Sequence, residues 1–311
     1  MRAITMRDFD ASPAEQDLEQ PTAGEGELLV AVEASSANPV DHAIAGGMLR
    51  GMFDYEFPVT LGRDFAGTVE ATGAGLEGYA EGDGVFGFLV HADPRVHAGT
   101  WSELMVAKAG GFVAHKPENV GSREAGAAPL AAVTALAAME AVEPGPDDTV
   151  LIVGASGGVG SFAAQLARRA GARVIAPGLA EDHGYLESLG VDEVVAREGD
   201  VVSEVSALAP DGVDVLIDVV STSPEELESF VPALAQGGRV ASSVGAAGDG
   251  AGRHNVMGSS DPAAMKTLAE LLANGQLEVP LQREYSLDRA PEALADLAAQ
   301  HTRGKLAIKV A

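Results

Sequence analysis

A glycine-rich turn between an apolar run and an amphipathic stretch constrains this chain more than any other feature. Residues 149–153 read Thr-Val-Leu-Ile-Val, residues 154–160 read Gly-Ala-Ser-Gly-Gly-Val-Gly, and residues 161–171 continue with helical periodicity to a closing glycine. This order predicts a strand, a tight turn and a helix. Glycines let a backbone approach a phosphate, and the first N–H groups of a helix attract negative charge. A nucleotide pyrophosphate is therefore expected at Ser156, Gly157, Gly158, Val159 and Gly160.

The spacing of this turn departs from the usual G-x-G-x-x-G pattern. Gly157 and Gly160 take the second and third glycine positions, but Ala155 stands at the first, and Gly154 lies one residue earlier. An ordinary strand-to-helix turn, with glycines only for tight packing, is the alternative interpretation. Nucleotide binding is favoured because strands and helices continue to alternate after the turn.

Composition places the chain among globular proteins and limits its cellular setting. It has 311 residues, 46% of them hydrophobic, and no cysteine. This length allows two domains, and the absence of cysteine excludes disulfides and thiolate metal ligands. The start shows no secretory signal and no stretch reaches 18 consecutive apolar residues, so we expect a cytoplasmic protein that does not enter a membrane.

The order of expected elements indicates an α/β protein with two kinds of domain. From residue 145 onward, strands are expected at 149–153, 172–176, 193–195, 213–219 and 239–244, a possible sixth at 253–257, and helices at 159–170, 181–189, 201–208, 224–235, 262–274 and 290–299. Strands of this kind between helices predict a doubly wound parallel sheet. Short strands near 28–33, 67–72 and 85–89, separated by turn residues, predict a β-barrel-like first domain. A terminal strand at 305–310 is expected to complete that first domain.

Several short motifs, in order along the chain, together resemble one family. They are Asn38-Pro-Val-Asp41, Leu61-Gly-Arg-Asp-Phe-Ala-Gly67, Gly82-Asp-Gly-Val85, Gly99-Thr-Trp-Ser-Glu-Leu104, Pro129-Leu-Ala-Ala-Val-Thr-Ala135, the turn 154–160, and Gly304-Lys305. This set resembles the zinc-independent quinone oxidoreductases, the zeta-crystallin-like group of medium-chain dehydrogenase/reductases. The resemblance covers essentially the whole chain and is far more specific than any single motif.

The resemblance implies a domain plan and an activity. It implies a GroES-like substrate domain at residues 1–120, completed by 260–311, and a Rossmann dinucleotide-binding domain at 121–259, with the active site in the cleft between them. It also implies hydride transfer from NADPH to a quinone or an α,β-unsaturated ketone. Homodimers or tetramers joined through the edge of the Rossmann sheet are common in this group, and a homodimer is expected here.

Zinc-dependent relatives place Cys where Asn38 stands and a His-Glu pair where Arg63-Asp64 stands. A guanidinium is always protonated and cannot bind a metal. The cysteine-rich structural zinc lobe of those relatives is also absent. We therefore expect no catalytic zinc.

Without a metal, hydrogen-bond donors must stabilise the negative charge that develops on the substrate oxygen. The candidate catalytic residues are Asn38, Asp41, Arg63 and Thr134. The Asn38 amide is the first candidate donor, although Asn38 could instead hold the turn before Pro39. Arg63 with Asp41 or Asp64 is favoured as a buried structural ion pair. Thr134 lies where the family's helix approaches the nicotinamide, with a core position as the alternative.

The remaining cofactor contacts are expected where later strands end. Val219, Ser243, Val244 and Gly245 follow two of those strands and should flank the ribose and nicotinamide, since ligands bind at the carboxyl ends of such sheets. The second strand ends at residues 176–178 without the acidic residue that selects NAD, which permits NADP. The family's usual Ser and Lys are missing after this strand, so Arg197 is the tentative 2′-phosphate partner.

Two other functions remain open at this point. One is a zinc-free alcohol or enoyl-thioester reductase of the same fold, for which Tyr55 lies near the catalytic tyrosine position, although our register places Met52 there. The other is a non-enzymatic NADPH-binding protein, because fold alone does not fix function.

The net charge of the chain is −26, from 46 acidic and 20 basic residues. Nucleic acid is excluded as a partner because its phosphates would be repelled. Such acidity also suggests a protein adapted to a salt-rich cytoplasm, where counter-ions screen self-repulsion.

This hypothesis predicts that added KCl stabilises the protein. The free energy of unfolding should rise from dilute buffer to multimolar KCl, because the screened folded state loses more repulsion than the expanded chain. Denaturant unfolding at a series of KCl concentrations measures this dependence. Full stability in dilute buffer, unchanged by salt, would contradict a halophilic origin.

Overall fold

The computed structural model describes residues 1–311 except 90–98, 257–260 and 300. The chain divides into two compact units, one formed by residues 1–130 with 261–311 and the other by residues 131–260. Residues 121–130 therefore lie in the first unit, where the short helix α2 (Ser122–Ala125) packs on the first unit's main sheet. Among the described residues, no helix has the length and apolar character needed to cross a bilayer. The expected cytoplasmic location stays a prediction.

The second unit is built on a six-stranded parallel sheet. Its strands, in spatial order, are β11 (Glu193–Ala196), β10 (Arg173–Gly178), β9 (Thr149–Val153), β12 (Val213–Asp218), β13 (Leu234–Ser242) and β14 (Arg253–Asn255). Every neighbouring pair is parallel. Numbered from β9, the order is 3-2-1-4-5-6, which is that of the doubly wound dinucleotide-binding fold. The expected α/β fold with a Rossmann sheet is confirmed.

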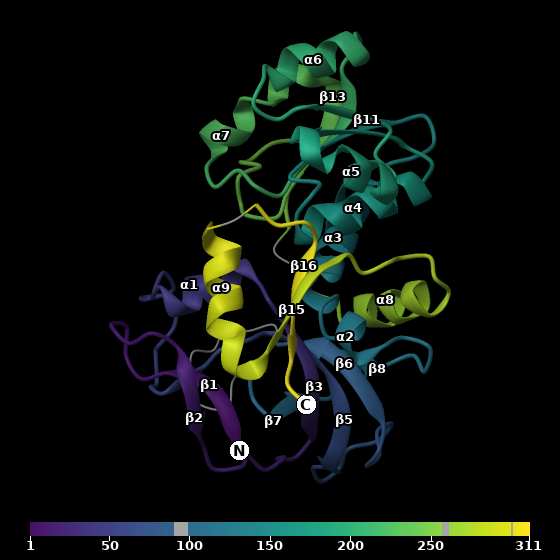
Figure 1. The fold of residues 1–311 in the computed structure, drawn as a ribbon. Helices are drawn as coiled ribbons and strands as arrows, with labels where there is room; N and C mark the ends of the chain where they lie inside the picture. Colours follow the sequence, from purple (N-terminus) through teal and green to yellow (C-terminus); the bar gives the residue numbers. More distant parts are fainter. Residues whose placement is uncertain (90–98, 257–260, 300) are drawn as a thin grey trace. The chain divides into compact units, whose positions relative to one another are not determined.

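Helices connect these strands, and the chain order of the unit can be followed in Figure 1. They are α3 (Pro129–Val142), which begins in the first unit, then α4 (Gly158–Arg169), α5 (His183–Leu189), α6 (Val201–Leu208) and α7 (Pro224–Glu228), with short 3-10 turns at Ala180–Asp182 and Val231–Ala233. The apolar faces of the sheet strands are buried, including Leu151, Ile175 and Leu216, all 0% exposed. Burial of such continuous apolar strands on both faces stabilises a covered parallel sheet.

One expected helix of this unit is shorter than predicted. The sequence predicted a helix at 224–235, but α7 ends at Glu228 and β13 already begins at Leu234. Pro232 lies between them in a 3-10 turn, because its ring removes an N–H donor and disfavours a helical residue before it. The pair Gly237-Gly238 lies inside β13, where the register with β12 shifts.

The first unit contains a seven-stranded sheet and a three-stranded sheet. The larger sheet has β15 (Leu281–Ser286), β16 (Lys305–Lys309), β3 (Glu27–Ala37), β5 (Asp64–Thr72), β6 (Gly84–Phe88) and β8 (Val113–His115), with β7 (Leu104–Lys108) paired to β3. The smaller sheet has β2 (Ala14–Asp17), β1 (Arg2–Met6) and β4 (Val59–Thr60). Helices α1 (Pro39–Ala45), α8 (Ala263–Ala273) and α9 (Ala290–Ala299) and a 3-10 turn at Leu287–Arg289 complete the unit.

The C-terminal strand belongs to this first unit, as the sequence predicted. β16 pairs antiparallel with the end of β3, with Leu306 opposite Ala37 and Lys309 opposite Ala34, and Figure 1 shows the two strands side by side. The unit is therefore discontinuous in sequence. Its core gathers residues from both chain segments, including Phe65, Trp101, Met105 and Ile308.

β3 is longer than the sequence predicted, and its extension leads into the site described below. The expected strand covered 28–33, but β3 runs to Ala37. Ser35 and Ser36 are fully buried because their hydroxyls donate hydrogen bonds to Asp64, at 2.6 Å to the Asp64 carbonyl and 2.6 Å to Asp64 Oδ2, respectively. Polar residues that would be expected to end a strand are thus part of it, because a residue distant in sequence accepts their hydrogen bonds.

Candidate functional site

The glycine turn of the second unit has the geometry of a phosphate-binding loop. Gly154 adopts φ +91°, and a Cβ there would lie 2.4 Å from Val220 Cγ2. Gly154, one residue earlier than the usual pattern, is therefore the residue that makes the tight turn. A Cβ on Gly160 would lie 2.1 Å from the Gly154 carbonyl oxygen, so this glycine lets α4 pack close to β9.

The start of α4 presents backbone donors to a ligand. Gly157 is the N-cap residue, in extended geometry, and no side chain of the described residues caps the helix there. The first N–H groups of a helix have no partner within it and face an incoming anion. A Cβ on Gly157 would meet only the Gly154 oxygen, at 3.5 Å, which leaves the backbone open on its outer side. The loop fits a pyrophosphate.

The expected flanking residues lie at the same edge of the sheet. Asp218 pairs with Val153 of β9 and with Ser242 of β13, so Val219 and Ser243 emerge beside the glycine turn. Asp218 Oδ1 accepts hydrogen bonds from the N–H groups of Val220, at 2.8 Å, and Ser221, at 2.9 Å. These bonds fix the loop that follows β12.

The loop after β13 is fixed in a similar way and remains accessible. Ser242 Oγ accepts from the Ala246 N–H group at 3.0 Å. Val244 is 46% exposed, and Gly245 adopts φ +85°. An apolar side chain left exposed at the carboxyl edge of a parallel sheet is consistent with a surface that a cofactor covers.

The end of β10 bears on the choice between NAD and NADP. β10 ends at Gly178, and the Arg197 N–H group donates to the Gly178 carbonyl at 3.0 Å. The backbone of Arg197 therefore lies beside the end of this strand. Arg197 is exposed, whereas Asp182 is fully buried at the start of α5. Glu181 is exposed and lies in the 3-10 turn before α5.

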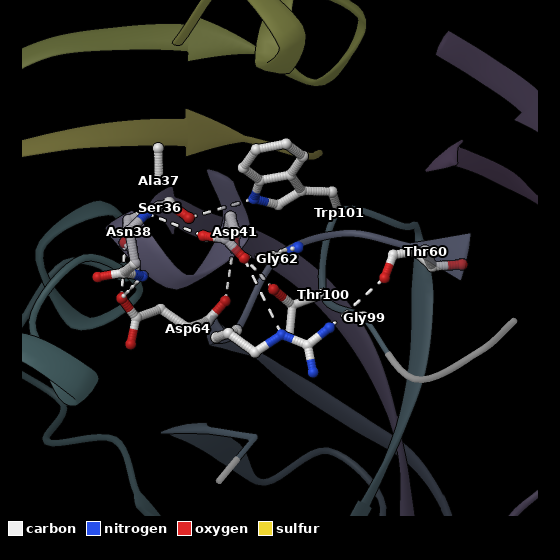
Figure 2. A network of polar contacts seen from close by, with 12 residues as sticks. Ser36, Ala37, Asn38, Asp41, Thr60, Gly62, Asp64, Gly99, Thr100 and Trp101 are labelled. Carbon is white, nitrogen blue, oxygen red and sulfur yellow. Dashed lines mark hydrogen bonds and ion pairs between the residues drawn. The ribbon is translucent and has the colours of Figure 1, made fainter. Parts of the chain in front are cut away.

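The first unit holds a buried cluster of polar and charged side chains where β3 ends and β16 begins. Asp64, 0% exposed, is one of its carboxylates, and Figure 2 shows it close to Asn38. Asp64 Oδ2 accepts from Ser36 Oγ at 2.6 Å and from Asn38 Nδ2 at 2.8 Å, and Asp64 Oδ1 accepts from the Leu130 N–H group at 2.7 Å. The last contact places a carboxylate at the first turn of α3, where the helix dipole favours negative charge.

Asn38 occupies this cluster and also begins α1. It is extended before Pro39 and is the N-cap residue of α1, and its N–H group donates to Asp41 Oδ2 at 2.8 Å. Its side-chain nitrogen is directed to Asp64, with a longer contact of 3.4 Å to Ser36 Oγ. The structure therefore gives Asn38 the turn-holding role, and its role as an oxyanion donor stays a prediction.

Asp41 and Arg63 lie together on the other side of the cluster, 0% and 1% exposed. Asp41 Oδ1 is 3.9 Å from Arg63 Nε. It also accepts from the Gly62 N–H group at 3.1 Å, and Figure 2 shows Asp41 beside Gly62. Burial raises the pKa of Asp41 to about 6, and the charge of Asp64 adds to the rise, while Arg63 and the Asn38 N–H group oppose it. This is the buried pair favoured from the sequence.

The cluster includes a lysine whose role the sequence did not predict. Lys305, the first residue of β16, is 3% exposed and lies 2.5 Å from Asn38 Oδ1. The available signal was a lysine directly before the apolar run Leu306-Ala307-Ile308, in a strand whose other lysine, Lys309, is exposed. Such a lysine is almost never fully buried without a partner.

Thr134 and Tyr55 complete the set of expected residues. Thr134 lies in α3, in the second unit, and is 6% exposed. Tyr55 is partly buried beside Phe9 and Phe57, and its hydroxyl donates to the Ile44 carbonyl at 3.1 Å. Met52, at the position our register gave to a catalytic tyrosine, is 67% exposed.

Comparison with known proteins decides the family. Residues 24–118 match the alcohol dehydrogenase GroES-like domain, and residues 189–308 match the zinc-binding dehydrogenase domain. A chloroplast envelope quinone oxidoreductase homolog of Arabidopsis thaliana is 32% identical over 226 residues, which cover 71% of this chain and 67% of the relative. The chain belongs to the medium-chain dehydrogenase/reductases. Within this family it falls in the quinone oxidoreductase-like group that its motifs resemble.

Further members of the family agree over the whole chain. The quinone oxidoreductase from Coxiella burnetii superposes with a TM-score of 0.88 at 26% identity, over 100% of this chain and 99% of that one. An NADPH-dependent alkenal/one oxidoreductase of Arabidopsis thaliana is 26% identical over 99% of this chain and 79% of its own length. The expected GroES-like and Rossmann architecture of this medium-chain dehydrogenase/reductase is thus confirmed.

A zinc ion, which one matched domain's description names, does not suit the side chains at the aligned positions. Lys305 lies beside Asn38 and Asp64, and the buried Arg63 is paired with Asp41 in the same cluster. A divalent cation at the same place would be repelled by both.

The raised pKa of Asp41 predicts a pH-dependent stability that one substitution removes. Asp41 has a pKa of about 6 in the folded protein and 3.8 as a free side chain, so the folded state retains a proton that the unfolded chain releases. Stability contributed by this group is lost as pH rises through that window. The free energy of unfolding of wild type should therefore fall by about 2–3 kcal/mol relative to that of Asp41→Asn as the pH rises from 4 to 7.

Denaturant unfolding of both proteins across this pH range measures the difference. Asp54→Asn, which changes an exposed carboxylate, is the control and should run parallel to wild type. If the free energies of unfolding of Asp41→Asn and wild type ran parallel with pH, the Asp41 carboxyl would have the same pKa in the folded and the unfolded protein, which would contradict this prediction.

Proposed function

We propose that this protein is an NADPH-dependent reductase that transfers a hydride to quinones or α,β-unsaturated ketones without a metal. The observation that carries the proposal is the glycine turn at the uncapped start of α4, in a chain whose relatives are named quinone and alkenal/one oxidoreductases. The whole chain aligns with the second of these relatives, so its substrate domain as well as its nucleotide domain has a counterpart there.

The residues of the second unit would hold the cofactor by its charged and polar parts. The N–H groups of residues 158–160 bind the pyrophosphate, with Ser156 beside them, while Val219 and Ser243–Gly245 flank the ribose and nicotinamide. When bound, the nicotinamide supplies a hydride. Negative charge then develops on the acceptor's carbonyl oxygen, and solvent provides the proton. The Asn38 amide and the N–H groups near Val244 and Gly245 are the candidate donors to that oxygen.

We further propose that the site prefers NADPH to NADH. β10 ends at Gly178 with no carboxylate to bind the ribose 2′-hydroxyl, and the nearby buried Asp182 is shielded from a ligand. Arg197 starts beside the same strand end and is exposed, as a partner for a 2′-phosphate must be. Glu181 is the one exposed acid of this turn that would oppose the phosphate.

The proposed assembly is a homodimer joined through the edge of the second unit's sheet. β14 forms one edge of this sheet, paired on its inner side with β13. An edge strand presents backbone groups that a second copy can pair with. Light scattering of the purified protein should give twice the mass of one chain, and a monomer mass would contradict this assembly.

The activity is tested by stopped-flow oxidation of bound NADPH with a panel of quinones and enones. Wild type should oxidise NADPH with at least one acceptor and bind NADPH more tightly than NADH at matched salt. Binding without oxidation by any acceptor would favour a non-enzymatic NADPH-binding protein. A tenfold preference for NADH in Kd would overturn the choice of cofactor.

Gly157→Val is the sharpest variant for the cofactor site. The backbone at Gly157 is extended, and its Cβ would have room, so the fold should tolerate valine while the branched side chain blocks the pyrophosphate. We expect at least about 100-fold weaker NADPH binding. Gly184→Val, on the exposed side of α5 with nothing within 4 Å of its Cβ, is the matched control and should bind normally. Unchanged binding by Gly157→Val would contradict the proposed loop.

A further inference from the structure

Lys305 is a buried ammonium with three oxygen neighbours. Its Nζ lies 2.5 Å from Asn38 Oδ1, 3.4 Å from Asp64 Oδ2 and 3.4 Å from the Ala37 carbonyl oxygen. An ammonium has three hydrogens to donate, so the three oxygens match its capacity. With 3% of its surface exposed, Lys305 has exchanged nearly all of its hydration for these contacts. Such an exchange is favourable only when the oxygens hold their places.

This ammonium fixes the orientation of the Asn38 amide. Lys305 donates to Asn38 Oδ1, while Asn38 Nδ2 donates to Asp64 Oδ2, so the amide is held from both ends by opposite charges. A flipped amide would place its hydrogens against the ammonium and its oxygen against the carboxylate. Both contacts would then be repulsive, and two hydrogen bonds to charged groups, which are stronger than bonds between neutral groups, would be lost. One amide orientation is therefore enforced.

Lys305 also balances the charge of the cluster. The two buried carboxylates are Asp41 and Asp64, and the two buried cations are Arg63 and Lys305. Arg63 is 3.9 Å from Asp41, whereas Lys305 is 3.4 Å from Asp64. Without Lys305 the cluster would keep one uncompensated negative charge in a buried environment, which is strongly unfavourable.

The position of the ammonium has a second significance. In zinc-dependent relatives, the residues at positions 38, 63 and 64 include the metal ligands, as the sequence resemblance implies. Here the Asn38 and Asp64 oxygens converge instead on an ammonium that the chain itself supplies from its C-terminal strand. The cation is fixed by β16 pairing with β3 and cannot dissociate.

We propose that Lys305 is the resident cation of this site and a positioning residue for the reductase reaction. It fixes the Asn38 amide and keeps Asp64 compensated, so that Ser36 and the first turn of α3 retain their partner. It does not contact the substrate and acts through Asn38. The proposal rests on the proposed function for its catalytic consequence, whereas the cation site itself can be tested without activity.

Substitutions at Lys305 separate charge from packing. Lys305→Met fills the space without a charge, and Lys305→Arg keeps a charge. Lys305→Ala leaves a cavity lined by the three oxygens, into which a propylammonium ion can place its head group. Lys309→Ala, on the exposed side of the same strand, is the matched control.

We expect kcat of Lys305→Met to fall about 10-fold or more, because a misplaced positioning group costs rate at the chemical step. The Kd for NADPH should stay within about twofold of wild type, because the expected cofactor contacts lie in the other unit. Lys305→Arg should retain more activity than Lys305→Met, and Lys309→Ala should match wild type. Propylammonium should restore part of kcat to Lys305→Ala in a saturable way, but not to Lys305→Met.

The activity-independent measurement is the melting temperature in the presence of propylammonium chloride. The ion should raise the melting temperature of Lys305→Ala above that seen with equal sodium chloride, and should leave Lys305→Met and Lys309→Ala unchanged. This measurement needs no turnover, so it holds even if wild type oxidises no NADPH, an outcome that would overturn the proposed function alone. If Lys305→Ala does not fold, the comparison of Lys305→Met with Lys305→Arg decides.

Three results would overturn the inference. A folded Lys305→Met with unchanged kcat and KM would show that the ammonium positions nothing used in catalysis. A lower melting temperature with unchanged kcat per folded molecule would reduce Lys305 to a structural role. Equal melting and equal activity of Lys305→Met and Lys305→Arg would show that the charge itself is not required.

Discussion

The compensation of buried charge is the interaction on which the first unit of this protein depends. Asp64 is fully buried, and a carboxylate in that environment is tolerated only when donors surround it. Ser36, Asn38 and Lys305 all direct donors to one of its oxygens, and the N–H group at the start of α3 satisfies the other. These donors come from three distant parts of the chain, namely the end of β3, the start of α3 and the start of β16. The cluster can therefore form only in the folded unit.

This requirement links the site to the topology. β16 pairs with the end of β3, and this pairing delivers Lys305 to the cluster from the C-terminal end of the chain. β5 begins at Asp64 and pairs with the middle of β3. The discontinuous first unit is therefore the arrangement that brings the cation to its carboxylate. An oxidoreductase of this family that has no cysteine or histidine at the aligned metal positions can thus retain an ordered, charged site.

The charge to be compensated in the second unit belongs to the proposed ligand and not to a buried side chain. Here the backbone supplies the charge complement through the first turn of α4, and glycines give the close approach that such contacts require. Asp218 and Ser242 hold the neighbouring loops through hydrogen bonds to backbone N–H groups. The cofactor edge therefore depends on local backbone geometry, whereas the polar cluster of the first unit depends on contacts between distant residues.

The sequence by itself determined the elements whose causes are local. The strand at 149–153 and the glycine turn after it follow from apolar periodicity and turn chemistry, and the doubly wound sheet follows from their repetition. The helix expected at 224–235 ends at Glu228, and the local signal for this end is Pro232, which lies in the 3-10 turn that follows. Only the tertiary structure decided that β3 extends to Ala37 and that Lys305 is a buried partner of Asn38, because those outcomes depend on groups that are far apart in the chain. A hydrogen bond or ion pair between distant segments leaves no periodic pattern in a sequence, and it exists only once the fold has removed water from both partners.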